Sequence, residues 1–93
     1  MENKTKKYKI DGDTFYYRPC AWAYIEFEQL TGKPFAEAED TVKDTLSLIW
    51  ACTVAGMKIE GKPFDMDFEA YVLKIDDNLS IISELAGEVT EKK

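Results

Sequence analysis

Aspartate clusters are the part of this sequence that most resembles a site for chemistry, because carboxylate and amide oxygens are the ligands that calcium ions prefer. Asp11 and Asp13 are spaced like the first two ligands of a calcium-binding loop, but Phe15 stands where a third oxygen ligand belongs. Residues 76–78, Asp-Asp-Asn, fail the same test, since Gly87 occupies the twelfth position, where the loop requires a glutamate. Asp and Asn are also favoured in turns and at helix N-termini. We therefore expect turn and capping roles at these positions and no metal site.

The residue types needed for catalysis are sparse. The chain has no histidine, which removes the commonest general base, the triads built on histidine and most zinc sites. Cys20 and Cys52 are too far apart for a CxxC pair, so we expect free thiols among apolar neighbours, although a disulfide is possible if their helices pack. Glu26 and Glu28 lie two positions apart on a predicted helix and point about 200° from each other, which is poor geometry for a catalytic pair. We predict that the protein is not an enzyme, with no catalytic residue and no cofactor.

Charge and hydropathy narrow the class of partner. The 93 residues carry a net charge of -6. Residues 1–18 hold five basic and three acidic groups, whereas residues 19–93 hold seven basic and fifteen acidic groups. An acidic body repels phosphate backbones, so we expect no nucleic-acid partner. No apolar run approaches the roughly 20 residues that span a bilayer, and no signal peptide is visible, so we expect no membrane contact and a cytoplasmic location.

The N-terminal segment predicts a β-hairpin over about residues 6–18. Apolar and polar side chains alternate on both sides of Asp11-Gly12, and an Asp-Gly pair between alternating runs is a strong hairpin signal. A two-stranded hairpin is marginally stable by itself, so its apolar side must lie on another element. We expect that element to be the helix that begins near Cys20.

Helical periodicity fills most of the remaining chain. The predicted helices span about residues 20–31, 41–56, 66–75 and 78–89. In the first helix, Ala23, Phe27 and Leu30 fall on one face, and Trp22 and Ile25 widen that apolar stripe.

The ends of the later helices carry local signals. Thr41 can cap the second helix and Gly56 is placed to end it, with Trp50 expected in the core. Asp65 or Asp67 can cap the third helix.

The tetrad Gly-Lys-Pro-Phe occurs at residues 32–35 and again at 61–64. We interpret both copies as turns between helices, in which the phenylalanine packs back on the protein. The sequence as a whole predicts a single domain over residues 1–93. Its fold class is α+β, predominantly α, with an N-terminal β-hairpin packed on a small bundle of three to four helices.

Two short runs resemble a known family. The run FEQLTGK at residues 27–33 ends an amphipathic helix, and the run LSLIWA at residues 46–51 lies in the next helix. This pairing resembles the tail assembly chaperones of long-tailed bacteriophages and prophages, in which a Phe-Glu-x-x-Thr-Gly-Lys motif precedes a leucine-x-x-leucine-tryptophan-alanine helix. The resemblance covers roughly residues 15–90.

The resemblance implies a non-enzymatic chaperone that binds the tape measure protein and helps recruit tail tube subunits. It implies action in the cytoplasm of the bacterial host, absence from the mature virion and possible homo-oligomers. The residues that we expect to contact a partner are apolar or aromatic. They are Phe27, Phe35, Met57, Phe64, Met66 and Tyr71. One alternative is a small adaptor or regulatory module that binds a partner outside any phage. A second is a small enzyme that uses carboxylates, which the absence of histidine disfavours.

Overall fold

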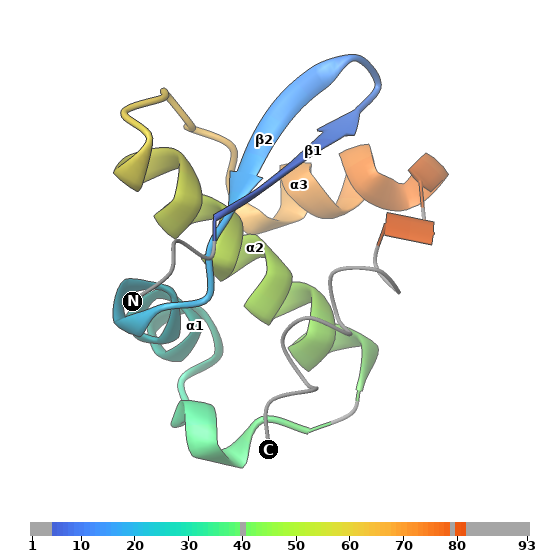
Figure 1. The fold of residues 1–93 in the computed structure, drawn as a ribbon. Coiled ribbons are helices and arrows are strands. Elements are labelled where there is room, and N and C mark those ends of the chain that lie inside the picture. The colour runs from blue at the N-terminus through green and yellow to red at the C-terminus, as the bar shows by residue number, and fades with distance from the viewer. Residues whose placement is uncertain (1–4, 40, 79, 82–93) are drawn as a thin grey trace.

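The part of the chain that the structure describes forms one β-hairpin and three α-helices (Figure 1). The computed structural model describes residues 5–39, 41–78 and 80–81. The elements are β1 (Lys6–Ile10), β2 (Asp13–Tyr17), α1 (Ala21–Thr31), η1 (Phe35–Glu37), α2 (Val42–Ile59), α3 (Phe68–Ile75) and η2 (Asp76–Asn78), where η denotes a short 3₁₀ helix. This order confirms the predicted α+β class with a predominance of helix. The fourth helix predicted at about 78–89 lies almost entirely outside the described residues. No helix among the described residues is long and apolar enough to cross a membrane.

The hairpin forms where the sequence predicts it. Asp11 and Gly12 have φ angles of 54° and 87°, the pair of positive values that a two-residue type I′ turn requires. The strands pair antiparallel, with Ile10 opposite Asp13 and Lys6 opposite Tyr17. The alternation of side chains buries one face of the hairpin and leaves Lys7 and Lys9 exposed on the other.

The hairpin packs on α2, so the prediction that it lies on the helix beginning near Cys20 is wrong (Figure 1). Tyr16 is at a position of the antiparallel ladder where backbone groups point away from the partner strand. Its N–H donates to the Sδ atom of Met57 at 3.3 Å. The N–H of Arg18 donates to the carbonyl oxygen of Cys52 at 2.9 Å. The outer edge of β2 is therefore bonded to α2 at two points.

Gly56 has a different role from the predicted helix end, because α2 continues for three residues beyond it to Ile59. A Cβ atom built on Gly56 would lie 2.5 Å from the carbonyl carbon of Tyr16 and 2.7 Å from the nitrogen of Tyr17. It would also contact the Tyr16 carbonyl oxygen. The glycine is thus the point at which the backbone of β2 crosses the surface of α2.

The core forms around α2. Its fully or nearly fully buried apolar residues are Ile10, Phe15, Tyr17, Ala23, Phe27, Leu46, Leu48, Ile49, Ala51, Cys52, Ala55, Met57, Tyr71 and Ile75. Trp50 is not one of them, contrary to the prediction. It is half-buried at the edge of the core, where its indole N–H donates to the Met66 carbonyl at 3.1 Å and its ring meets Phe68.

A chain of hydroxyl groups connects the hairpin, α2 and α3. The Oγ1 of Thr53 donates its hydrogen to the Ile49 carbonyl at 2.9 Å. It therefore accepts the hydrogen bond that the Tyr8 hydroxyl, 2.6 Å away, donates. The Tyr8 hydroxyl then accepts from the hydroxyl of Tyr71 at 2.8 Å. Burial raises the pKa of both tyrosines, so they stay neutral donors. Each hydroxyl therefore donates one hydrogen bond, and the chain runs from Tyr71 through Tyr8 and Thr53 to the Ile49 carbonyl.

Candidate partner-binding surface

The described residues offer no metal centre, since no group of three or more His, Cys, Asp or Glu side chains gathers among them. Asp11 and Asp13 are at the hairpin turn, where Asp13 pairs with Lys74 at 2.9 Å. Asp67 caps α3 by accepting from the Ala70 N–H at 2.8 Å. Turn and capping roles at these aspartates agree with the prediction.

The thiols are free. Cys52 is buried, and burial raises the pKa of its thiol, which keeps it protonated and unreactive. Cys20 is half-buried just before the first turn of α1.

The Thr-Gly-Lys part of the family-like motif forms the end of α1. Gly32 has a φ of 79°, and its N–H donates to the Glu28 carbonyl at 2.8 Å, as in a left-handed helix cap. Thr31 Oγ1 donates to the Phe27 carbonyl at 2.9 Å and accepts from the Lys33 N–H at 3.3 Å. The motif residues therefore fix a corner of the chain.

Lys33 joins this corner to the start of α2. Its Nζ atom lies 2.6 Å from Oδ2 of Asp44, a residue that is only 4% exposed and that also accepts from the Glu39 N–H at 2.8 Å. Two contacts hold the pKa of the Asp44 carboxyl below its ordinary value. The larger effect comes from the hydrogen-bonded Lys33 ammonium group and the smaller one from the Glu39 N–H. Thr41 caps the same helix end, as predicted, by accepting from the Asp44 N–H at 3.1 Å.

The six residues predicted to contact a partner lie in different environments. Phe27 and Tyr71 are fully buried. Met57, Phe64 and Met66 come together along a hollow of about 260 Å³ beside β2. Phe35 lies apart from them. Their role in binding stays a prediction, and the three that share the hollow are the ones that the fold brings together.

Both Gly-Lys-Pro-Phe turns pack as the sequence predicts. Phe35 stacks on Tyr24 with ring centroids 4.1 Å apart, and Phe64 meets the edge of Phe15 at 5.9 Å. Each phenylalanine thus covers one edge of the core.

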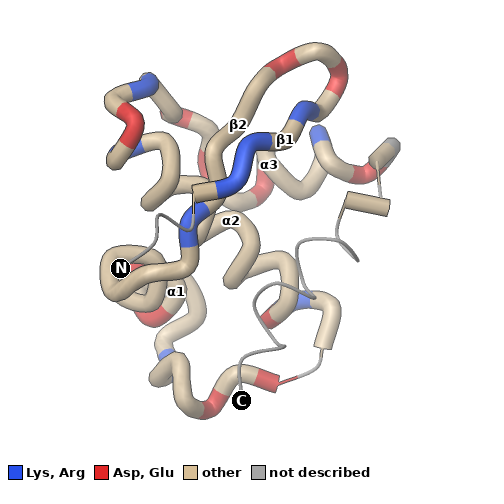
Figure 2. Tube along the Cα trace, in the orientation of Figure 1, with Lys and Arg blue, Asp and Glu red and all other residues tan. Residues whose placement is uncertain are grey.

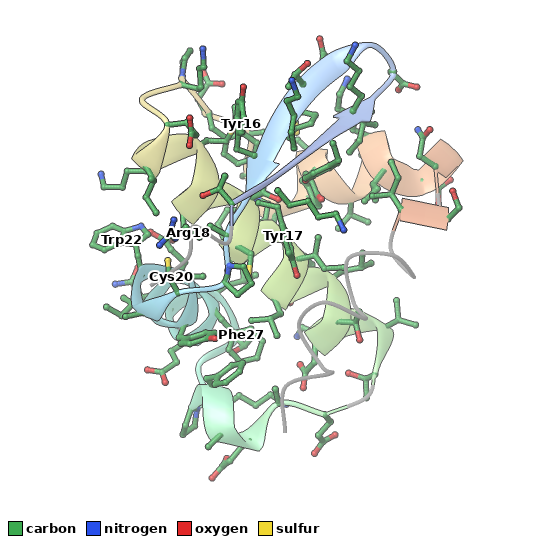
Figure 3. All side chains as sticks on the ribbon, viewed as in Figure 1. Tyr16, Tyr17, Arg18, Cys20, Trp22 and Phe27 are labelled. Atoms are coloured by element: carbon green, nitrogen blue, oxygen red, sulfur yellow. The ribbon has the colours of Figure 1, made fainter. Side chains whose placement is uncertain are left out.

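The apolar residues on the outward face of α1 form a surface that the sequence reading missed. Trp22 and Ile25 were expected to widen the buried stripe with Leu30, but these side chains are 41%, 46% and 36% exposed, respectively. Ile25 is two residues before the buried Phe27 and lies about 160° from it around the helix axis. Trp22 is five residues before Phe27 and lies about 140° from it. Figure 3 shows Trp22 pointing away from the body of the molecule. The i, i+3 spacing of Trp22 and Ile25 was the available signal, because it makes them neighbours on any helix face.

A basic groove lies beside this face. It consists of two adjoining hollows, of about 450 and 250 Å³, and we call it the Lys62 groove because Lys62 lines both. The first hollow is also lined by Lys7, Tyr16 and Met57, and the second by Trp22, Glu26, Lys58 and Phe64. The Lys58 Nζ atom lies 5.1 Å from the centre of the Trp22 ring, a cation–π contact.

Comparisons of the chain with protein-family models, with curated protein sequences and with solved structures returned no match in any of the three.

Proposed function

We propose that the protein is a non-enzymatic assembly chaperone of phage tails that binds the tape measure protein and helps recruit tail tube subunits. The observation that carries the proposal is the exposed apolar pair on α1, Trp22 and Ile25, directly next to the motif that resembles the tail assembly chaperones. An apolar pair one turn apart on a helix is the kind of surface on which an amphipathic partner helix docks.

Charge supports the same role. A tape measure protein is long and prone to aggregate, so its chaperone must supply apolar contacts and still keep the complex dissolved. The net charge of -6 favours solubility of such a complex. The motif corner at Gly32 and Lys33 contributes by holding α1 against α2, which presents the outward face of α1 as a rigid surface.

The sequence adds three further parts to the proposal. First, a helix over about residues 78–89 completes a bundle of four helices. Second, the protein acts in the host cytoplasm and does not enter the mature virion. A homo-oligomer is consistent with a chaperone that covers a long partner. The tail tube gene is expected upstream and the tape measure gene downstream, and an isolated operon would favour the adaptor alternative.

Co-expression tests the proposal. The protein, tagged, is expected to co-purify with the tape measure protein encoded in the same tail gene cluster and to keep it in the soluble fraction. Ile25→Glu is expected to reduce the recovered tape measure protein at least about tenfold, because a charge replaces an apolar contact. Leu73→Glu is the matched control, since Leu73 is a 70% exposed aliphatic residue on α3.

Both variants are first checked for wild-type circular dichroism and thermal unfolding. Failure of the wild-type protein to retain the tape measure protein would refute the proposed function. Equal losses with Ile25→Glu and Leu73→Glu would refute the role of the α1 surface.

A further inference from the structure

The Lys62 groove has a charge opposite to that of the protein that contains it. Three lysines line it, against one carboxylate, Glu26. Lys7 and Lys62 form no ion pair with any residue that the structure describes. Figure 2 shows the basic residues of β1 as a blue stretch across the front, while acidic residues lie at the hairpin tip, around η1 and, as Glu60 and Asp65, on either side of Lys62 in the chain. The groove is therefore a local positive region on an acidic molecule, and it attracts carboxylates or other anions.

Apolar surface lies between these lysines. The indole of Trp22 is 41% exposed, and Phe64 and Met57 line the hollows on either side of Lys62. A simple anion would leave this surface in water, so the best ligand has negative groups and large apolar side chains together. A peptide segment rich in Glu or Asp with interspersed Leu or Phe has that chemistry.

Nucleic acid fits the groove less well. Single strands bind by stacking bases on aromatic rings along a continuous basic track. Here the face of Trp22 already lies under Lys58, at 5.1 Å, and the ring of Phe64 is engaged with Phe15. Beyond the groove, the acidic body repels a long polyanion.

We propose that the Lys62 groove binds an acidic, amphipathic segment of a partner protein. A large apolar side chain of the segment packs against the parts of Trp22 and Phe64 that Lys58 and Phe15 leave uncovered, and its carboxylates pair with Lys58 and Lys62. The proposal goes beyond the chaperone function and does not require the partner to be the tape measure protein. Lys62 is central because it borders both hollows.

A direct binding experiment tests this proposal. The probe is a peptide of about 14 residues made of Glu, Leu and Ala and labelled with a neutral fluorophore, titrated with the wild-type protein and followed by fluorescence anisotropy. Lys62→Glu is expected to weaken binding at least about tenfold, because like charges then face each other across the contact. Lys43→Glu changes the net charge equally at an exposed position near the other end of α2, and it is expected to weaken binding less than about twofold.

Peptide variants separate the two parts of the recognition. Replacing Glu with Lys in the peptide is expected to abolish binding, and replacing Leu with Ser is expected to weaken it at least about tenfold. In a Trp50→Phe background, Trp22 is the only tryptophan, so the probe is expected to change the Trp22 emission.

Four results would overturn the proposal. One is equal binding of the acidic and the lysine peptide, and another is an equal loss with Lys43→Glu and Lys62→Glu. A third is tighter binding of a thymidine oligonucleotide of about 12 nucleotides, which would make the groove a nucleic-acid site. The fourth is self-association that Lys62→Glu abolishes, which would make a second copy the occupant. The co-purification test depends on Ile25, which lines neither hollow, so the two proposals can fail separately.

Discussion

Replacing Gly56 with alanine is expected to destabilise this protein, although the same change inside most helices stabilises them by about 0.8–1 kcal/mol. The new methyl group would lie 2.5 Å from the carbonyl carbon of Tyr16 and 2.7 Å from the nitrogen of Tyr17. These are backbone atoms, so no side-chain rotation relieves the overlap. Either β2 moves away from α2 or the helix distorts.

The size of the effect follows from what holds β2 in place. Inserting a methyl group into a packed interior costs about 1–3 kcal/mol. A displaced β2 also weakens the hydrogen bonds from Arg18 to Cys52 and from Tyr16 to Met57, which contribute about 0.5–1.5 kcal/mol each at most. The hydrogen bonds are weakened and not fully lost, so their contribution and the helix-propensity gain of about 0.8–1 kcal/mol roughly cancel. The expected loss of unfolding free energy is therefore about 1–3 kcal/mol.

Urea unfolding followed by far-UV circular dichroism measures this loss, and the melting temperature is expected to fall by about 5–20 °C. Amide hydrogen exchange adds a local readout, since the Arg18 amide is expected to exchange faster in the variant. Gly61→Ala serves as the control, because Gly61 has no atom within 4 Å of a built Cβ and a φ of 72°. It is expected to cost about 1–2 kcal/mol from backbone strain, with Arg18 exchange unchanged. An unchanged or higher melting temperature for Gly56→Ala would refute the close contact of β2 with α2.

Three further predictions concern the buried and partly buried polar groups. Tyr8→Phe is expected to lower the unfolding free energy by about 1–3 kcal/mol, and Thr53→Val is expected to cost less in that background than in the wild-type protein, as a double-mutant cycle will show. Lys33 lowers the pKa of Asp44 in the folded protein, so the ion pair stabilises the fold at every pH above the ordinary pKa of an aspartate. This stabilisation is lost as the pH falls through the lowered pKa. Melting curves between about pH 7 and pH 3 are expected to show a shallower loss in Asp44→Asn than in the wild-type protein, and parallel curves would contradict the ion pair. Ser47→Ala is expected to raise the melting temperature, because the buried Ser47 hydroxyl has no hydrogen-bond partner among the described residues, and a fall would contradict that description.

Local signals predicted the parts of this fold that depend on neighbouring residues. The Asp11-Gly12 turn was predictable because positive φ angles restrict the residues that a type I′ turn accepts. Thr41 and Asp67 were predictable as caps because their side-chain oxygens reach the free N–H groups of the first helical turn. The buried face of α1 was harder to predict. Of the five residues proposed for its apolar stripe, Ala23 and Phe27 are buried, whereas Trp22, Ile25 and Leu30 are 41%, 46% and 36% exposed, respectively.

Several features depend on contacts between distant segments. Helical periodicity does not select the buried face of α1, because large apolar residues occur around most of its circumference, and packing against α2 decided that Phe27 faces in and Trp22 faces out. A glycine near the end of an apolar run is equally consistent with a helix end and with a close crossing, and only the position of Tyr16 shows that Gly56 is a crossing.

The sequence by itself determined the hairpin, the helix caps, the acidic balance and the family-like motif, because each depends on residue type and short spacing. The tertiary structure decided which helix supports the hairpin, which side of α1 is exposed and how lysines from β1, α2 and the following loop meet at one groove. The physical reason is that burial and charge clustering arise between residues far apart in the chain, and no local pattern records which of them will meet.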